Sequence, residues 1–168
     1  MSLNRTIDLL YQYKAWANDE LFNALLCIDK VKHAEEVHAA TRILNHIYVV
    51  DRLFKAQLLE KTPEFTDTNT EETPELDTLY SNVQIVDQWY IDYSAGLNQQ
   101  ELSENIHFTF VDGDSGRMSR EEILLHIVTH GGYHRGAVGR IMAQLSIAPP
   151  RDIFTRYLHD SDPNRRKS

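Results

Sequence analysis

The stretch Thr129-His130-Gly131-Gly132-Tyr133-His134-Arg135-Gly136 lies inside a segment, residues 119–146, whose apolar residues recur at helical spacing. Histidines four apart on a helix share one face, so His130 and His134 can converge on one metal ion. At about 100° per residue both fall within one apolar stripe. The stripe consists of Ile123, Ile127, His130, His134, Ile141 and Leu145. The sequence therefore predicts a helix with two candidate metal ligands in the middle of its buried face.

Three further segments have the amphipathic spacing of long helices, and two of the four expected helices have clear start signals. Helices are expected over residues 3–28, 34–60 and 74–98. Thr73-Pro74 is typical of a helix start, and Ser119 with Glu122 forms a capping box that opens the fourth helix. Four long helices without a large sheet predict an all-α four-helix bundle.

The segments between the helices complete this prediction. Residues 61–73 form a polar loop long enough to be a crossover along the bundle, or a lid. Residues 106–116, β-rich and then turn-rich, predict a small β-hairpin or extended excursion before the last long helix. The closing segment, residues 152–159, is expected to pack its apolar side on the bundle. We expect one domain over residues 1–168.

A third histidine lies at helical spacing with apolar residues of the second helix. That face carries Ile43, His46, Val50, Leu53 and Gln57. In a small bundle, an inward His46 is the natural third ligand for an ion bound by His130 and His134. Taken alone, a histidine on an apolar face is more often a hydrogen-bonded core side chain than a metal ligand.

The composition excludes several classes of protein. A net charge of −8 and the absence of a basic stripe argue against nucleic acid as a partner. No apolar stretch approaches the roughly 20 residues that span a bilayer, and the N-terminus lacks a signal-peptide core, so no membrane association is expected. Cys27 is the only cysteine, which excludes an internal disulfide and favours a reducing, cytoplasmic location. We expect Cys27 to be a small packed side chain.

Three protein ligands leave coordination positions open for water or substrate, as in catalytic sites. Imidazole suits zinc, nickel, iron and copper, so the pattern does not name the metal. Two other metal patterns fail. A zincin protease needs glutamate after the first histidine, where this chain has Gly131. A di-iron carboxylate bundle needs Glu-x-x-His on two helices, and only Glu35-x-x-His38, at a helix start, matches.

Several motifs in order along the chain resemble the DinB/YfiT family. They are Tyr13-Lys14-Ala15-Trp16-Ala17-Asn18, Leu44-Asn45-His46, the run from Leu125 to Gly136, and Asp152-Ile153-Phe154. The resemblance implies a four-helix bundle with an unusual crossover, and a divalent metal ion (zinc, nickel, iron or manganese) held by His46, His130 and His134. It also implies a homodimer. Characterised relatives include metal-dependent transferases that act with low-molecular-weight thiols.

One position departs from the family pattern. The family often continues His-Arg-Gly-Gln, whereas this chain has Ala137, so an amide near the metal face is missing. His126 is a further candidate, as a fourth ligand, a flanking acid or base, or a core histidine. Arg135 is either a substrate-binding group or part of a surface ion pair. The candidate residues around the metal are Asn45, Tyr48, Asp51, His126, Tyr133 and Arg135.

These observations support two functional hypotheses from different classes. In the first, the protein is a metal-dependent S-transferase or hydrolase that activates a thiol or water to attack a small-molecule substrate. In the second, it is a non-catalytic metal-binding module for stress response or protein interaction. A third interpretation, a structural bundle with three core histidines, needs no metal.

Overall fold

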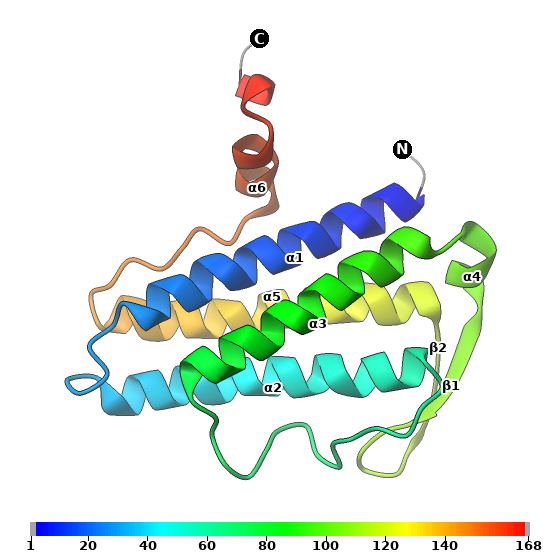
Figure 1. Ribbon diagram of the computed structural model, residues 1–168, viewed down its shortest axis with the longest axis horizontal. Coiled ribbons are helices and arrows are strands. Elements are labelled where there is room, and N and C mark those ends of the chain that lie inside the picture. The colour runs from blue at the N-terminus through cyan, green and yellow to red at the C-terminus, as the bar shows by residue number, and fades with distance from the viewer. Residues whose placement is uncertain (1–2, 167–168) are drawn as a thin grey trace.

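The computed structural model describes residues 3–166 and is mainly helical, as the sequence predicts. Four long helices contain most of the chain (Figure 1): α1 (Leu3–Leu26), α2 (Ala34–Leu58), α3 (Leu76–Gly96) and α5 (Arg120–Gln144). The shorter elements are α4 (Gln99–Ser103), β1 (Asn105–Thr109), β2 (Ser115–Ser119), α6 (Phe154–Ser161) and the 3₁₀ turn η1 (Pro163–Arg166). No helix within residues 3–166 is both long and apolar enough to cross a membrane.

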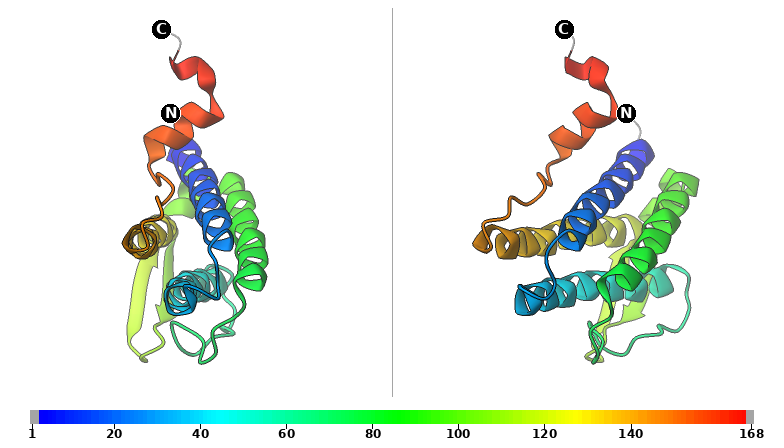
Figure 2. Two further views of the ribbon diagram at one scale, coloured as in Figure 1. Left: turned by 90° about the vertical axis from the view of Figure 1, so that its left-hand side faces the viewer. Right: turned by 60° about the vertical axis from the view of Figure 1, so that its left-hand side comes forward.

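The long helices pack in two layers. The pair α1 and α3 lies over the pair α2 and α5 and is inclined to it (Figures 1 and 2). Helices α2 and α3 run in the same direction, because residues 59–75 travel back along the molecule between them (Figure 1). This long return confirms the expected crossover connection.

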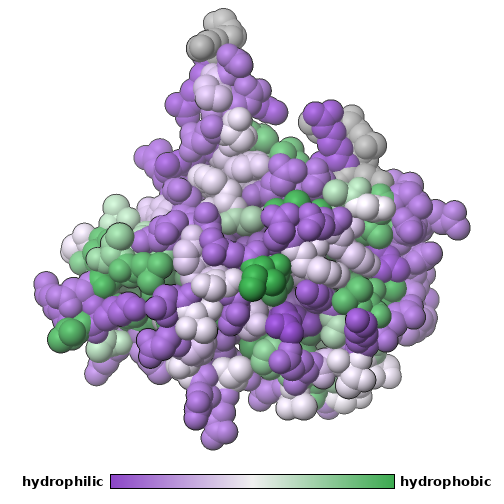
Figure 3. All heavy atoms as spheres, in the orientation of Figure 1, coloured by the Kyte–Doolittle hydropathy of each residue, from purple (hydrophilic) through white to green (hydrophobic). Residues whose placement is uncertain are grey.

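The core between the layers has two apolar clusters, one toward each end of the molecule. One is built around Tyr11, Tyr90 and Ile127, and the other around Phe22, Leu44 and Met142. On the face shown in Figure 3, hydrophilic residues predominate and hydrophobic ones form small separate patches. The buried apolar side chains of the long helices pack against each other in these two clusters.

The β-hairpin expected before the last long helix is present. Strand β1 pairs antiparallel with β2, and Phe108 lies opposite Gly116. The hairpin packs at the end of α2 and α5 (Figure 1), where Phe108 contacts Phe54 of α2 with ring centroids 5.7 Å apart. A two-stranded hairpin is marginally stable alone, so this packing holds it.

The first half of the closing segment packs on the long helices, as expected. Helix α6 stands away from the long helices (Figures 1 and 2), but its base contacts α1. Tyr13 meets Phe154 edge-on at 5.4 Å, and Trp16 lies 5.7 Å from Tyr157.

Two local expectations are wrong, and one element was not expected. Helix α3 begins at Leu76 with an extended Glu75 as its N-cap, so Thr73-Pro74 is still loop. The short helix α4, opened by an Asn98 capping box, was not predicted. Cys27 is exposed, because it follows the last turn of α1 where the chain leaves the core.

The buried face of α5 is also rotated from the predicted stripe. It centres on Ile127, Gly131, Arg135 and Val138, and the two histidines lie half-buried at its edge. The physical reason is that α5 contacts both α1 and α2, so the arc it buries is set by two neighbours at once. The predicted stripe of α2, which begins at Ile43, is likewise mostly half-buried. The histidines are thus at a seam that solvent and small molecules can reach.

Candidate metal centre

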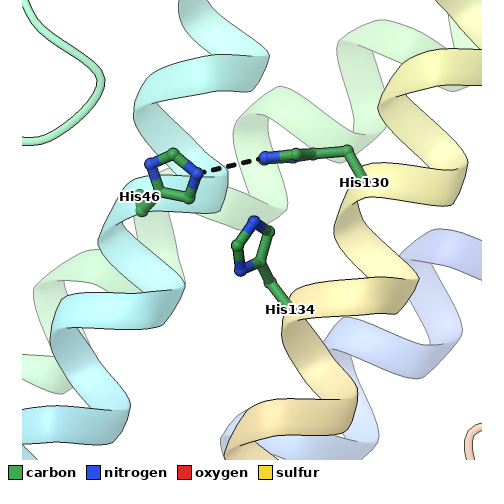
Figure 4. A group of neighbouring side chains, drawn as sticks. All are labelled: His46, His130 and His134. Carbon is green, nitrogen blue, oxygen red and sulfur yellow. Dashed lines mark hydrogen bonds between the residues drawn. The ribbon is translucent and has the colours of Figure 1, made fainter.

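Helices α2 and α5 bring three histidines together. His46 comes from the middle of α2, and His130 and His134 come from successive turns of α5 (Figure 4). The ring centroid of His46 lies 5.0 Å from that of His130 and 4.7 Å from that of His134. The centroids of His130 and His134 are 4.5 Å apart. The three imidazoles therefore face one another across the seam between the two helices.

The spacing of the ring nitrogens fits a metal ion. Nε2 of His46 lies 3.1 Å from Nε2 of His130. Bonds of 2.0–2.1 Å place neighbouring ligand nitrogens about 2.9–3.4 Å apart, from octahedral to tetrahedral geometry. The ligand atoms of all three histidines lie within 4.8 Å of one another. Small side-chain rotations are thus enough to complete a three-nitrogen set, and these residues can hold a metal ion.

A backbone carbonyl orients the ring of His46. Its Nδ1 lies 2.8 Å from the carbonyl oxygen of Thr68. A carbonyl only accepts hydrogen bonds, so Nδ1 carries the proton and Nε2 presents its lone pair toward His130. The crossover loop, residues 59–75, therefore sets the tautomer of a candidate ligand.

Asn45 holds that loop in place. Its side-chain amide donates to Oδ1 of Asn69 and to Oγ1 of Thr70, each at 2.6 Å. Asn69 in turn donates to the carbonyl of Arg42 at 3.1 Å. Asn45 is buried, and its side chain points into the loop. It acts on His46 through the position of the loop.

The surroundings keep the α5 histidines neutral. Burial lowers the pKa of His130 to about 3, and the neighbouring imidazoles of His134 and His46 add to the effect. Burial also lowers the pKa of His134, with a smaller contribution from His46. Nδ1 of His130 is buried and lacks a hydrogen-bond partner among the described residues. Neutral imidazoles with free lone pairs are the form that binds metals.

Three other predicted residues do not join this group. His126 lies one turn before His130, with ring centroids 5.4 Å apart, and packs against Phe54 at 5.1 Å. Burial lowers its pKa. Tyr133 is 79% exposed and touches His134 edge-on, while the hydroxyl of Tyr48 accepts a hydrogen bond from Arg52.

The remaining candidates belong to a buried polar network on the other side of α5. Arg135 is 2% exposed, so of the two alternatives for this residue the surface ion pair is wrong. Its Nε donates to Oδ2 of Asp152 at 2.7 Å and its Nη1 to Oδ1 of Asn18 at 3.2 Å. A helix residue one position after a ligand points about 100° away from it, which explains this placement.

Asp51 is paired with a buried lysine. Nζ of Lys14 donates to Oδ2 of Asp51 at 2.7 Å and to Oδ1 of Asp87 at 2.6 Å. Asn18 links Asp87 to Arg135 by donating from Nδ2 to Oδ2 of Asp87 at 2.7 Å. The network thus joins all four long helices to the segment before α6.

Sequence reasoning missed the members Lys14, Asn18, Asp87 and Asp152. The available signal was a charged side chain at a core position: Lys14 lies on the apolar stripe of α1, and Asp87 lies between Val83 and Tyr90 at helical spacing. Such a charge is buried only when it is paired.

Gly131 makes room for this network beside the histidines. A Cβ at this position would lie 3.1 Å from Nη1 of Arg135 and 3.7 Å from Cε of Lys14. The glycine between the two candidate ligands is therefore a packing requirement for the charged side chains. Ala137, the position that departs from the family pattern, is exposed.

The comparison with known protein families identifies the family of this chain. A model described as the DinB family matches residues 1–166. The chain belongs to the DinB family. Protein DinB of Bacillus subtilis (strain 168) is 26% identical over 164 residues, which cover 89% of this chain and 91% of that protein. No solved structure shows significant similarity to the chain.

Membership of the DinB family agrees with the site geometry. The family match covers both helices that carry the histidines, the crossover loop and the segment before α6. A three-histidine cluster in a DinB chain is compatible with metal binding.

Proposed function

We propose that His46, His130 and His134 bind one divalent metal ion, and that this DinB protein is a metal-dependent enzyme. The observation that carries the proposal is the convergence of three imidazoles within 4.8 Å, two of them kept neutral by their surroundings. Three protein ligands on one side of an ion leave positions open for water or substrate. We further propose that the layered helices form the four-helix bundle expected from the sequence, within a single domain.

The proposed reaction is attack of a thiol or water on a small-molecule electrophile. A bound divalent ion supplies Lewis acidity that lowers the pKa of a coordinated thiol or water toward neutrality. The chain contributes orientation: the Thr68 carbonyl directs Nε2 of His46, and burial keeps His130 ready to bind without losing a proton. We also propose that the thiol is a cytoplasmic thiol of low molecular weight and that the protein is a homodimer.

Metal analysis of untagged protein tests the binding step. We expect about one equivalent of a first-row metal in the wild type and a marked loss in His130→Ala. His107→Ala is the matched control, because His107 is exposed on β1 and outside the cluster. Equal metal content in wild type and His130→Ala would overturn the site.

A conjugation assay tests the enzymatic step. The metal-loaded protein is incubated with a thiol and an aryl halide, and thioether formation is followed with time. We expect a rate above background that disappears in His46→Ala and persists in His107→Ala. Tight metal binding without turnover for any thiol or for water would favour the non-catalytic binding module instead.

A further inference from the structure

A cavity of about 410 Å³ opens beside the histidines, beneath the hairpin. Volumes of roughly 300–1,000 Å³ are usual for small-molecule sites. Its walls come from α2, the start of the crossover loop, the hairpin and α5, and include both His46 and His130. Because two candidate metal ligands form part of the wall, a ligand that fills the cavity lies against the candidate metal centre.

The predicted apolar stripe of α2 is one wall of this cavity. Val50, Leu53 and Gln57 continue the line of His46 along the helix, and Phe54 lies beside them. Leu53 is half-buried although it lies on an apolar stripe. The stripe therefore provides a lining for the cavity where the sequence predicted helix packing.

The hairpin forms the opposite wall with Phe108, Phe110, Val111 and Met118. Gly116 allows the two phenylalanine rings to adopt their positions. A Cβ on Gly116 would lie 2.6 Å from Cε2 of Phe108 and 2.8 Å from Cε2 of Phe110. A short strand pair thus places an aromatic surface over the seam between α2 and α5.

The lining favours an uncharged ligand. Among the lining residues, all within the described part of the chain, none is Asp, Glu, Lys or Arg. The polar lining side chains are Gln57, Thr68, Thr109 and the histidines. Away from a metal ion at the histidines, an ionised group placed among these apolar walls would lose its hydration without gaining a partner of opposite charge.

We propose that this cavity binds an uncharged apolar group, an aryl ring or a branched aliphatic chain, of the electrophile that reacts at the metal centre. The reaction in this inference rests on the proposed function, whereas the binding of the apolar group rests on the cavity alone. It assigns the side of the metal centre under the hairpin to the apolar part of the electrophile.

A matched pair of fluorescent probes tests the charge preference. N-phenyl-1-naphthylamine is neutral, and 8-anilinonaphthalene-1-sulfonate has the same aromatic rings with one sulfonate. We expect saturable binding of the neutral probe to the full chain, with an affinity about ten-fold or more above that of the sulfonate. Equal affinities, or no binding of the neutral probe, would overturn the proposal.

Variants locate the probe. Leu53→Asp places a charge on the cavity wall and should weaken the neutral probe about ten-fold or more, whereas Ile85→Asp, at a 67% exposed position of α3, should not. Gly116→Ala displaces the aromatic wall and should also weaken binding; Gly96→Ala, with open space around it, is its control. Circular dichroism selects variants that remain folded. Unchanged binding in folded Leu53→Asp and Gly116→Ala would place the probe elsewhere and refute the assignment.

His134→Ala separates this inference from the proposed function. His134 belongs to the histidine cluster but does not line the cavity. We expect His134→Ala to lose metal and keep the neutral probe, and Leu53→Asp to keep metal and lose the probe. A protein that binds metal but not the probe refutes the cavity assignment only, and one that binds the probe but not metal refutes the metal centre only.

Discussion

Arg135 follows His134 directly in α5, yet its Nε donates to Oδ2 of Asp152 at 2.7 Å on a different face of the helix. The same turn of helix therefore serves two purposes. One face presents an imidazole to the seam with α2, and the next residue ties the segment before α6 to the core. The pair explains how a sequence motif of adjacent residues can combine a candidate ligand with a structural anchor.

Removing the guanidinium should destabilise the protein strongly. Arg135→Ala leaves Asp152 and Asn18 without their cationic partner. Breaking a fully buried ion pair costs about 3–5 kcal/mol, and because the Asp152 side chain is 25% exposed we expect a loss toward the lower end of that range. Urea-induced unfolding measures the change. Arg156→Ala is the control, since its pair with Asp160 is largely exposed and should contribute no more than about 0.5 kcal/mol. Similar losses in both variants would contradict the assigned role of Arg135.

Two glycines of α5 should respond oppositely to alanine. Alanine in a helix interior is favoured over glycine by about 1 kcal/mol. At Gly136, with no atom within 4 Å of the added Cβ, we expect stabilisation of that order. At Gly131 the Cβ would crowd Arg135 at 3.1 Å, and overpacking of about 1–3 kcal/mol should make the net change destabilising. Thermal unfolding of both variants tests this, and stabilisation by Gly131→Ala would show that the guanidinium can move aside.

Asn45 should affect metal affinity without being a ligand. Asn45→Ala releases Asn69 and Thr70, and with them the carbonyl that orients His46. Loss of such an outer partner typically lowers metal affinity by about 10–100-fold. Competition with a chromogenic chelator measures the affinity, and Asn23→Ala, exposed on α1, is the control. An unchanged affinity in folded Asn45→Ala would dissociate the loop from the site.

The Lys14–Asp51 pair predicts a specific pH dependence of stability. Burial raises the pKa of Asp51 from 3.8 to about 6; Lys14 opposes this and Asp87 reinforces it. Between these pKa values the folded protein holds a proton that the unfolded chain has released. The free energy of unfolding contributed by Asp51 is therefore largest at low pH and falls as the pH rises through that window.

Comparison with Asp51→Asn isolates this effect, because asparagine does not titrate. We expect the stability of the wild type relative to Asp51→Asn to decrease as the pH rises from 3.8 to about 6, and then to level off. Urea unfolding at several pH values across the window gives the difference. A relative stability that increases with pH would mean that Lys14 lowers the pKa of Asp51 below its ordinary value.

Local interactions explain which features were predictable. The capping box of Ser119 and Glu122 uses groups three residues apart, and it forms as predicted. Thr73-Pro74 has equally good local chemistry but is not a helix start. The loop before it is held by a long-range contact, in which Arg42 donates to the carbonyl of Thr70, and the helix begins only after the extended Glu75.

In the candidate site, too, some features follow from local spacing and others from long-range contacts. His130 and His134 share a face because of helical spacing alone. That His46, 84 residues earlier than His130, meets them could be inferred from its apolar surroundings and the family resemblance, and the structure brings the three together. The cavity under the hairpin had no sequence signal, since its apolar residues are also those of an ordinary core.

The sequence by itself determined the mainly helical fold, the long polar loop after the second helix, the β-rich segment before the last long helix and the spacing of the histidines, because each follows from backbone periodicity or from contacts within a few residues. Only the tertiary structure decided that Arg135 points inward, that Lys14 is shared by Asp51 and Asp87, and that the stripe of α2 lines a cavity. The physical reason is that the arc a helix buries depends on which neighbours it crosses and at what angle, and no local pattern contains that information.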